Sequence, residues 1–152
     1  MKKQITRRKF IETSTVAGAA VAVACASSSV SSYKRIIGAN DRISIGIIVC
    51  GNRGSEAHMT GLHKHDKEMN VEITALCDPY RVAREKANEY VKEWYGRDAR
   101  QVVSYSELLA LDNVDAVTIA SCDHQHATHL EAAARAGKDV YVEKPIARDL
   151  ES

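Results

Sequence analysis

Short β-branched, apolar runs alternate with helical patterns along the chain from Arg42 onward, and this alternation constrains the fold more than any other feature. The first run, residues 43–49, is almost entirely apolar, as expected for a strand that is covered on both faces of a parallel sheet. Further strands are predicted at residues 71–77, 101–103, 115–120 and 139–142. The helices between them are predicted at residues 55–65, 81–94, 106–111 and 126–136.

Strands that are separated by helices at this spacing imply parallel crossover connections. Since such crossovers are right-handed, the sequence predicts an α/β fold, a Rossmann-like, doubly wound parallel sheet with strand order 3-2-1-4-5. The folded part has an odd number of cysteines at wide spacing, which does not suggest a disulfide framework. We therefore expect Cys50, Cys77 and Cys122 to be small buried hydrophobic residues.

The turn after the first predicted strand carries part of a nucleotide-binding fingerprint. In the full G-x-G-x-x-G pattern the first glycine allows a tight turn, but here Val49 holds that position, while Gly51 and Gly54 hold the second and third. The second glycine lets the backbone approach a pyrophosphate, and the third lets helix and strand pack closely. The helix that follows offers free N–H groups and a positive dipole end to the phosphates. The missing first glycine is expected to strain the turn or to loosen nucleotide binding.

Asp78 ends the second predicted strand, 24 residues after Gly54. An acid at this place can accept hydrogen bonds from the hydroxyls of an adenosine ribose. Its charge repels a 2′-phosphate, which favours NAD over NADP, although the nearby Arg81 weakens that argument. The alternative is that Asp78 caps the helix that begins near Pro79, and one carboxylate can serve both roles.

Two polar segments follow the fourth and fifth predicted strands. Residues 121–129 hold Cys, Asp and three His, which could supply zinc ligands. We favour instead contacts with cofactor or substrate, and expect no metal, because no second cluster of comparable density follows. After the fifth strand, Lys144 can bond a substrate hydroxyl or carbonyl, with Glu143 as its partner. The alternative for these two residues is a surface ion pair before a loop proline.

Together these segments resemble the glucose–fructose oxidoreductase, inositol dehydrogenase and MocA family, written Gfo/Idh/MocA. The resemblance runs from Arg42 to Ser152 and rests on "RISIGIIVCGNRGSEAH", "EITALCDPYRVAREKANEY" and "YSELLALDNVDAVTIASCDHQHATHLEAAARAGKDVYVEKPIA". The last stretch is the most specific, because it joins a strand, a His-ending turn, A-G-K-x-V and E-K-P. The resemblance implies an NAD(P)-binding Rossmann domain that precedes a C-terminal α/β domain with the substrate contacts.

The same resemblance assigns residues to a site that binds NAD, or less readily NADP. This sequence departs from the family pattern at Val49, Cys122 and Gln125, and it ends before the family's sixth strand and second domain. The full-length relatives are expected to be homo-oligomers. The resemblance places Gly51, Asn52, Arg53 and Gly54 at the pyrophosphate, Asp78 at the ribose, Asp123, His124, Gln125 and His126 on the nicotinamide side, and Glu143 and Lys144 in the E-K-P element, with Lys144 as the catalytic lysine.

Residues 1–26 have the pattern of an export signal, with a basic start, an apolar stretch rich in Ala and Val, and a small-residue exit. Arg7 and Arg8, followed by Phe10 after one spacer, match the twin-arginine consensus. We expect transport by the twin-arginine translocase to the periplasm or cell envelope, with cleavage before Ser27.

The residues that follow the expected cleavage site, 27–41, are predicted to be a polar tether. The sequence around Cys25 also resembles a lipoprotein box, which would leave a lipidated cysteine at the N-terminus. Simple cleavage remains the favoured alternative. Residues 42–152 would then form the incomplete NAD(P)-binding domain.

Charge and hydropathy exclude two classes of partner. The whole chain has a net charge of +1, but without residues 1–26 it keeps 16 basic and 19 acidic residues, a net charge of −3. A mildly acidic domain gives no footprint for nucleic acid. No apolar run reaches the length of about 20 residues that a membrane span needs.

The sequence therefore predicts the cofactor domain of an exported sugar or polyol oxidoreductase, which would transfer a hydride at a carbinol carbon. Two alternatives stay open. One is the cofactor domain of an NAD-dependent glycosidase similar to α-N-acetylgalactosaminidase. The other is a non-catalytic nucleotide-binding remnant. The chain alone is expected to be inactive, because the substrate domain would lie beyond its end.

Export should depend on the arginine pair, because the translocase recognises both guanidinium groups and lysine is not an equivalent donor. Changing Arg7→Lys together with Arg8→Lys should leave the precursor in the cytoplasm, as measured by cell fractionation. Wild-type amounts of the double variant in the envelope would refute the twin-arginine assignment.

Overall fold

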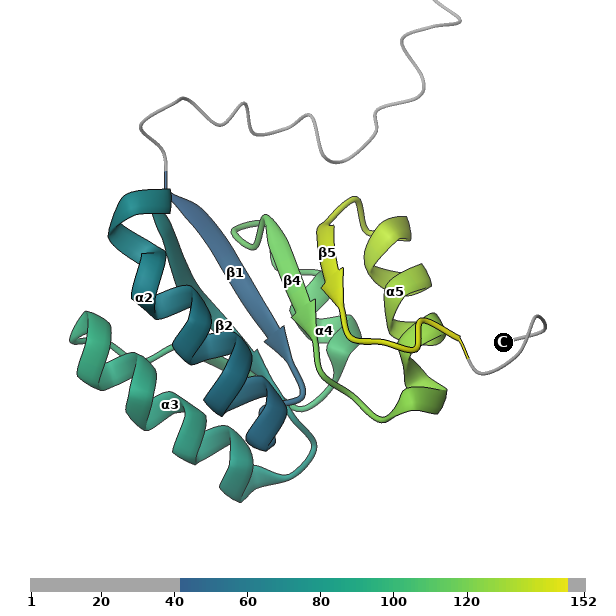
Figure 1. The fold of residues 1–152 in the computed structure, drawn as a ribbon, viewed down its shortest axis with the longest axis horizontal. Coiled ribbons are helices and arrows are strands. Elements are labelled where there is room, and N and C mark those ends of the chain that lie inside the picture. Colours follow the sequence, from purple (N-terminus) through teal and green to yellow (C-terminus); the bar gives the residue numbers. More distant parts are fainter. Residues whose placement is uncertain (1–41, 148–152) are drawn as a thin grey trace, which may run out of the picture. The chain divides into compact units, whose positions relative to one another are not determined.

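The computed structural model describes residues 42–147, and these form a five-stranded parallel sheet. The strand order is β3-β2-β1-β4-β5 (Figure 1), which confirms the predicted doubly wound topology. Every chain crossover therefore connects parallel strands, and the carboxyl ends of all five strands meet at one edge. The strands are β1 (Ile43–Ile48), β2 (Val71–Cys77), β3 (Arg100–Val102), β4 (Ala116–Ile119) and β5 (Asp139–Val142).

Helices pack on both faces of the sheet (Figure 1). On one face, a core cluster joins β1 and β2 to Met59 and Val91, so the first two long helices cover this side. On the other face, a second cluster joins β1 and β4 to Leu108 and Ala133. The helical segments are η2 (Arg53–Met59), α2 (Thr60–Met69), α3 (Arg81–Tyr95), α4 (Tyr105–Leu109), η3 (Asp123–Gln125) and α5 (His126–Arg135).

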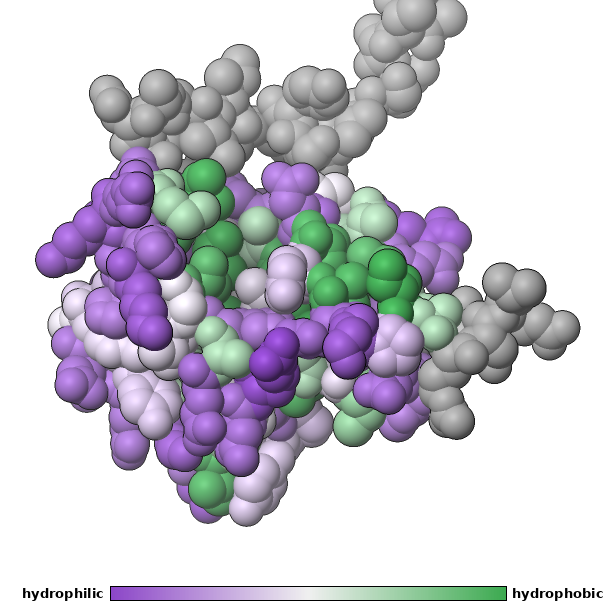
Figure 2. Space-filling model, viewed as in Figure 1, coloured by the Kyte–Doolittle hydropathy of each residue, from purple (hydrophilic) through white to green (hydrophobic). Residues whose placement is uncertain are grey.

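The face covered by α2 and α3 stays partly open over β4 and β5 in the described part of the chain. Tyr141 on β5 is 59% exposed there. Figure 2 shows hydrophobic surface on this face, beside the hydrophilic residues of the helices. Leu62, Thr118 and Tyr141 contribute to a cavity on this side.

The first helix differs from its prediction in both length and winding. It was predicted at residues 55–65, but the helical turns begin at Arg53 and continue to Met69. Its first part, η2, is a π-helix, a form that an apolar pattern of period 3.6 cannot indicate. The second long helix starts at Arg81, as predicted, with Tyr80 as its N-cap; Pro79, which suited a first helical turn, lies before the helix.

The cysteine prediction is correct for two residues and wrong for the third. Cys50 and Cys77 are buried at 2% and 3% exposure, within the two core clusters. Cys122 is exposed, in the turn between β4 and α5.

The predicted export signal (residues 1–26) and tether (residues 27–41) lie outside the described residues, as do residues 148–152. Within the described residues, 42–147, no helix has the length and apolar character needed to cross a membrane. The boundaries proposed for the signal and the tether stay predictions.

β1 ends in a residue whose backbone conformation is unusual for its type. Val49, which holds the first-glycine position, has a φ of 71°, in the left-handed region. Its N–H donates to the Cys77 carbonyl oxygen at 2.8 Å, so the turn is fixed to the end of β2. A β-branched residue in this region is strained, which agrees with the strain expected from the missing glycine.

Replacing Val49→Gly should therefore stabilise the domain. Relief of backbone strain should raise the free energy of unfolding by about 1–3 kcal/mol. The greater freedom of glycine in the unfolded chain should lower it by about 0.5–1 kcal/mol. A net gain of about 1 kcal/mol should raise Tm by roughly 4–8 °C, measured by thermal unfolding. Asn70→Gly is the matched control, because Asn70 also has a positive φ, of 53°, but asparagine tolerates it. A gain no larger than that of the control would show that the valine is not strained.

Candidate functional site

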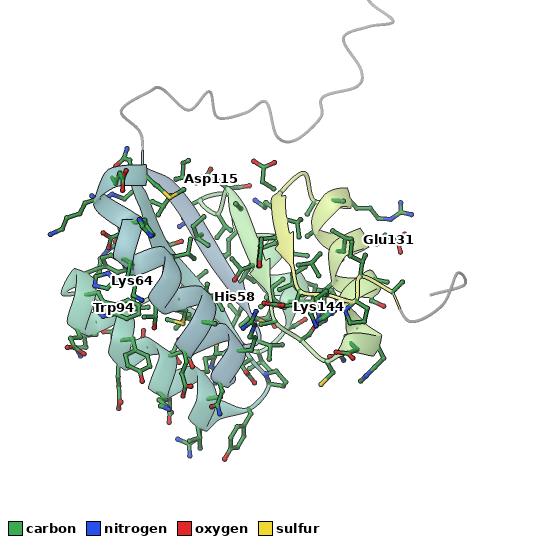
Figure 3. The ribbon with its side chains drawn as sticks, viewed as in Figure 1. His58, Lys64, Trp94, Asp115, Glu131 and Lys144 are labelled. Atoms are coloured by element: carbon green, nitrogen blue, oxygen red, sulfur yellow. The ribbon has the colours of Figure 1, made fainter. Side chains whose placement is uncertain are left out.

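The residues predicted for the site lie at the carboxyl-terminal edge of the sheet. The glycine turn follows β1, Asp78 follows β2, the turn that begins η3 follows β4, and Lys144 follows β5. Figure 3 shows His58 and Lys144 at this edge, and Asp115 at the opposite one. In a doubly wound sheet the ligand site is at this edge, where the strand order reverses between β1 and β4.

Two glycines of the turn have different roles. A Cβ on Gly54 would lie 2.1 Å from the Val49 carbonyl oxygen, so only glycine fits where the helix crosses the strand end. A Cβ on Gly51 would meet nothing within 4 Å, so this backbone is open to a ligand. The Asn52 side chain does not cap the helix, and the first N–H groups of a helix have no partner within it. These features fit a pyrophosphate group on the open backbone.

Asp78 links the glycine turn to the turn before α3. It is 5% exposed, and its Oδ2 accepts a 2.8 Å hydrogen bond from Cys50 N–H. Its Oδ1 accepts a 2.8 Å bond from Tyr80 N–H. The predicted capping role is wrong, because Tyr80 is the N-cap of α3 and no side chain caps this helix; the Asp78 carboxylate instead closes the turn before it. Each carboxylate oxygen has a second lone pair, and the predicted contact with a ribose stays a prediction.

Glu143 does not pair with Lys144, contrary to the prediction from the sequence. Its Oε1 accepts hydrogen bonds from Arg53 Nε at 2.6 Å and from His58 Nε2 at 2.7 Å. The His58 hydrogen bond is the largest cause that holds the pKa of Glu143 below its usual value, and Arg53 adds to it against partial desolvation. Both residues lie after the end of β5 at Val142, and the two hydrogen bonds direct the Glu143 carboxylate to η2.

His58 is a site residue that the sequence analysis missed. It is 8% exposed, and its ring meets Tyr141 edge-on with centroids 5.3 Å apart. His58 Nδ1 and Thr118 Oγ1 are buried and have no hydrogen-bond partner among residues 42–147. Both residues line the cavity of about 380 Å³ between α2 and the open part of the sheet. The π-helical turn places His58 beside Glu143, and the sequence pattern does not indicate that turn.

The turn after β4 contains four of the predicted cofactor contacts. Asp123, His124 and Gln125 form the short helix η3 and are exposed. His126 is 1% exposed, with Nδ1 2.7 Å from the Pro145 carbonyl oxygen and Nε2 2.9 Å from the Ser121 carbonyl oxygen. The His126 ring therefore fixes the loop after β5 against the end of β4.

Lys144 projects from the loop that His126 fixes. It is exposed, and its ammonium has no hydrogen bond or ion pair within residues 42–147. This group is therefore available to a ligand at the edge where the glycine turn lies. Among the described residues there is no group of three or more His, Cys, Asp or Glu side chains that could hold a metal ion.

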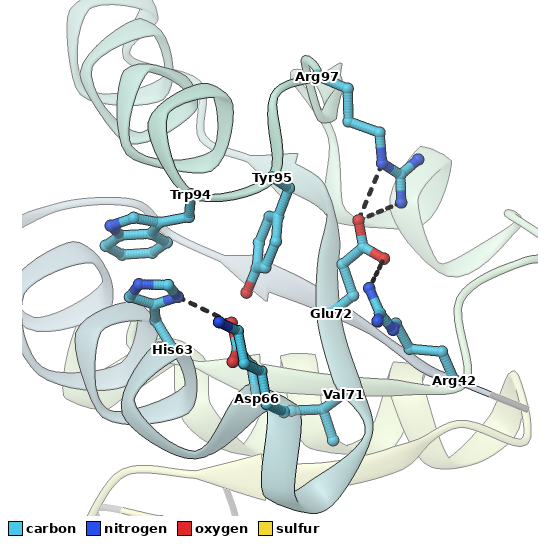
Figure 4. Close-up of a pocket in the computed structure, with 9 residues that line it drawn as sticks. Arg42, His63, Asp66, Val71, Glu72, Trp94, Tyr95 and Arg97 are labelled. Atoms are coloured by element: carbon cyan, nitrogen blue, oxygen red, sulfur yellow. Dashed lines mark hydrogen bonds and ion pairs between the residues drawn. The ribbon is translucent and has the colours of Figure 1, made fainter. Parts of the chain in front are cut away.

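A second cavity, of about 410 Å³, lies away from the predicted site residues (Figure 4). On one side, Glu72 bridges Arg42 at 2.8 Å and Arg97 at 2.9 Å. Burial works to raise the pKa of Glu72, but the hydrogen bonds from both arginines outweigh it and lower the pKa. On the other side, His63 stacks on Trp94 with ring centroids 4.2 Å apart. These contacts join β2 to α2 and α3, and they serve the packing of the fold.

Comparison with known proteins gives consistent matches. A family model described as the GFO_IDH_MocA oxidoreductase family, with an NAD-binding Rossmann fold, matches residues 43–152. A "Glycosyl hydrolase family 109 protein 2" from Shewanella sp. (strain ANA-3) is 33% identical over 95% of this chain and 34% of its own length. An inositol 2-dehydrogenase/D-chiro-inositol 3-dehydrogenase from Shouchella clausii is 35% identical over 69% of this chain and 28% of its own length.

The structural comparison agrees. The crystal structure of scyllo-inositol dehydrogenase from Lactobacillus casei, with bound NAD(H) and scyllo-inositol, has a TM-score of 0.62 and 27% identity. It covers 73% of this chain and 30% of the dehydrogenase. The chain thus spans about a third of the length of the relatives it matches.

The two glycines give a matched pair of variants. Gly54→Ala forces a Cβ against a backbone oxygen, so it should cost about 2 kcal/mol or more, seen as a lower Tm. Gly51→Ala has room in the protein and should change the stability by less than about 0.5 kcal/mol. Its methyl group would obstruct the pyrophosphate and weaken NAD binding about tenfold, which is roughly 1.4 kcal/mol by calorimetry. Unchanged NAD affinity in Gly51→Ala would mean that the nucleotide does not use this backbone.

Proposed function

The chain belongs to the Gfo/Idh/MocA oxidoreductase family, and from this premise we propose that it is the NAD-binding domain of an enzyme that oxidises a sugar or polyol. Because the chain covers about a third of its relatives' length, the activity and the substrate belong to the proposal. The name of the scyllo-inositol dehydrogenase, which has NAD(H) bound, supports both the cofactor and a polyhydroxylated substrate.

The observation that carries the proposal is that the ammonium of Lys144 has no partner within residues 42–147 and lies at the same edge as the open backbone of Gly51. Gly51, Gly54 and Asp78 would hold the nucleotide by backbone N–H groups and by hydroxyl hydrogen bonds. NAD, when bound, supplies the hydride acceptor. Lys144 can donate a hydrogen bond to a substrate oxygen and, when unprotonated, accept the proton of a substrate hydroxyl. His126 keeps the Lys144 loop in place during this step.

A glycosidase is the second candidate, and a specific observation favours it. The glycosyl hydrolase family 109 relative aligns over 95% of the chain, whereas the inositol dehydrogenase relative aligns over 69%. In an NAD-dependent route, NAD would accept a hydride from C3 of the sugar, the aglycone would leave by elimination, water would add at C1, and the hydride would return to C3. The two candidates therefore differ in whether NADH accumulates. The glycine turn and Lys144 would serve either reaction.

We also propose that the protein is exported through the twin-arginine translocase to the periplasm or cell envelope, which rests on Arg7 and Arg8. Such a protein would cross the membrane folded around its cofactor, which suits a compartment with little free NAD. A homo-oligomeric state of the full-length enzyme belongs to the same proposal.

The test uses this domain together with the region that follows it in its relatives. Wild type is assayed against inositols, sugars and aryl N-acetylgalactosaminides, with NADH absorbance and aryl release followed in parallel. NADH formation supports the oxidoreductase, aryl release without net NADH supports the glycosidase, and neither, in a folded protein that binds NAD, contradicts both. Lys144→Ala should lower kcat by about 10²–10⁴-fold. The control is Lys64→Ala, an exposed lysine on α2 (Figure 3), which should match wild type.

A further inference from the structure

We propose that His58 is a positioning residue, whose Nε2–H holds Glu143 so that the glycine turn and the loop of Lys144 keep a fixed relation. The contact joins two segments at the carboxyl-terminal edge of the sheet, because His58 lies on η2 after β1 and Glu143 follows β5. The inference deepens the proposed function and rests on NAD binding by this domain.

The π-helical winding of η2 is what makes this contact possible. Arg53 and His58 are five residues apart, and in an α-helix of 3.6 residues per turn they would be separated by about 140° around the axis. In a π-helix the hydrogen bonds connect residues five apart, so the two side chains lie on the same side. Both of them reach the same oxygen, Glu143 Oε1, at 2.6 and 2.7 Å.

The hydrogen-bond chemistry fixes the state of the His58 ring. An ionised carboxylate only accepts hydrogen bonds, so Nε2 must carry the hydrogen. In the neutral ring Nδ1 is then a bare acceptor, and it is buried without a partner within residues 42–147. The ring cannot turn freely, because its side chain is 5% exposed and its edge contacts Tyr141.

Burial decides which of the two partners orders Glu143. The Arg53 side chain is 62% exposed, so its ion pair with Glu143 is a surface pair of small net value. His58 has one preferred place in the protein, so its donor is available to Glu143 without further loss of side-chain freedom. The main chain supports the same position, since Glu143 N–H donates to the Ile119 carbonyl oxygen at 3.1 Å.

The consequence concerns both halves of the site. With His58 in place, Glu143 stays bonded to Arg53 of the glycine turn, and so keeps the start of the Lys144 loop at the same edge. Without the donor, the Glu143 carboxylate would keep only the 62% exposed side chain of Arg53 as its side-chain partner. The distance between the glycine turn and Lys144 would then vary. A smaller fraction of the protein would have the conformation that binds the cofactor.

The first test needs no cofactor. The carboxyl carbon of Glu143 is titrated by NMR in wild type, His58→Gln and His58→Leu. Gln can place an N–H₂ group near the position of Nε2, whereas Leu fills the space without a donor. The pKa of Glu143 should be low in wild type and in His58→Gln. In His58→Leu the pKa should be higher, so that the proton concentration at the titration midpoint is at least threefold lower than in wild type. An unchanged midpoint in His58→Leu overturns the proposal, as does a folded His58→Gln that behaves like His58→Leu.

The second test measures NAD affinity by calorimetry on the same chain. We expect His58→Leu to bind about fivefold more weakly and His58→Gln to stay within twofold of wild type. In a Glu143→Gln background, His58→Leu should add less than twofold, because its partner is already changed. His65→Leu, an exposed histidine on α2, is the matched control and should bind as wild type.

The outcomes distinguish a failure of NAD binding by this chain from a failure of the positioning role of His58. If wild type binds no NAD, the cofactor assignment of this chain fails, while the titration of Glu143 still decides the role of His58. If wild type binds NAD and His58→Leu binds it equally well with an intact thermal transition, the positioning role is refuted. If His58→Leu does not fold, His58→Gln still decides it, because a raised Glu143 pKa or a fivefold loss of NAD affinity in a folded His58→Gln contradicts the role of the donor.

Discussion

The close approach of Gly54 to the end of β1 is the constraint on which the site depends. A side chain at Gly54 would occupy the place of the Val49 carbonyl oxygen, so the helix can start only if this residue is glycine. Starting there, the helix points its free N–H groups at the strand edge where the sheet order reverses. The strained φ of Val49 and the buried carboxylate of Asp78, which binds Cys50 N–H, are both consequences of so sharp a turn.

Two polar contacts fix other segments of the sheet edge relative to the glycine turn. Glu143 brings the loop after β5 to η2, and His126 brings the same loop to the end of β4. In both contacts the histidine is buried and its partner belongs to a distant part of the sequence. These two contacts thus fix the loop after β5 to η2 and to the end of β4, which is the kind of support that precise positioning of a ligand needs.

The fold followed from the sequence because its signals are local. Alternating strands and helices fix the crossovers, handedness fixes the strand order, and the two glycines at positions 51 and 54 mark the turn. The site followed only in part. The edge and its residues were predicted, but the predicted partner of Glu143 was wrong, since its partners Arg53 and His58 come from η2, about 85–90 residues away in the sequence. His58 was missed because a π-helical turn shifts the side chains away from the pattern of period 3.6.

The distribution of thiols gives the domain a built-in place for a chemical label. Burial raises the pKa of Cys50, and it raises that of Cys77 to about 12, so neither thiol presents the reactive thiolate near neutral pH. Cys122 is the exposed cysteine of the described residues, and it directly precedes η3 at the ligand edge. A maleimide dye would therefore attach beside the site without an engineered cysteine, and its fluorescence could follow movements of the turn after β4 as ligands arrive.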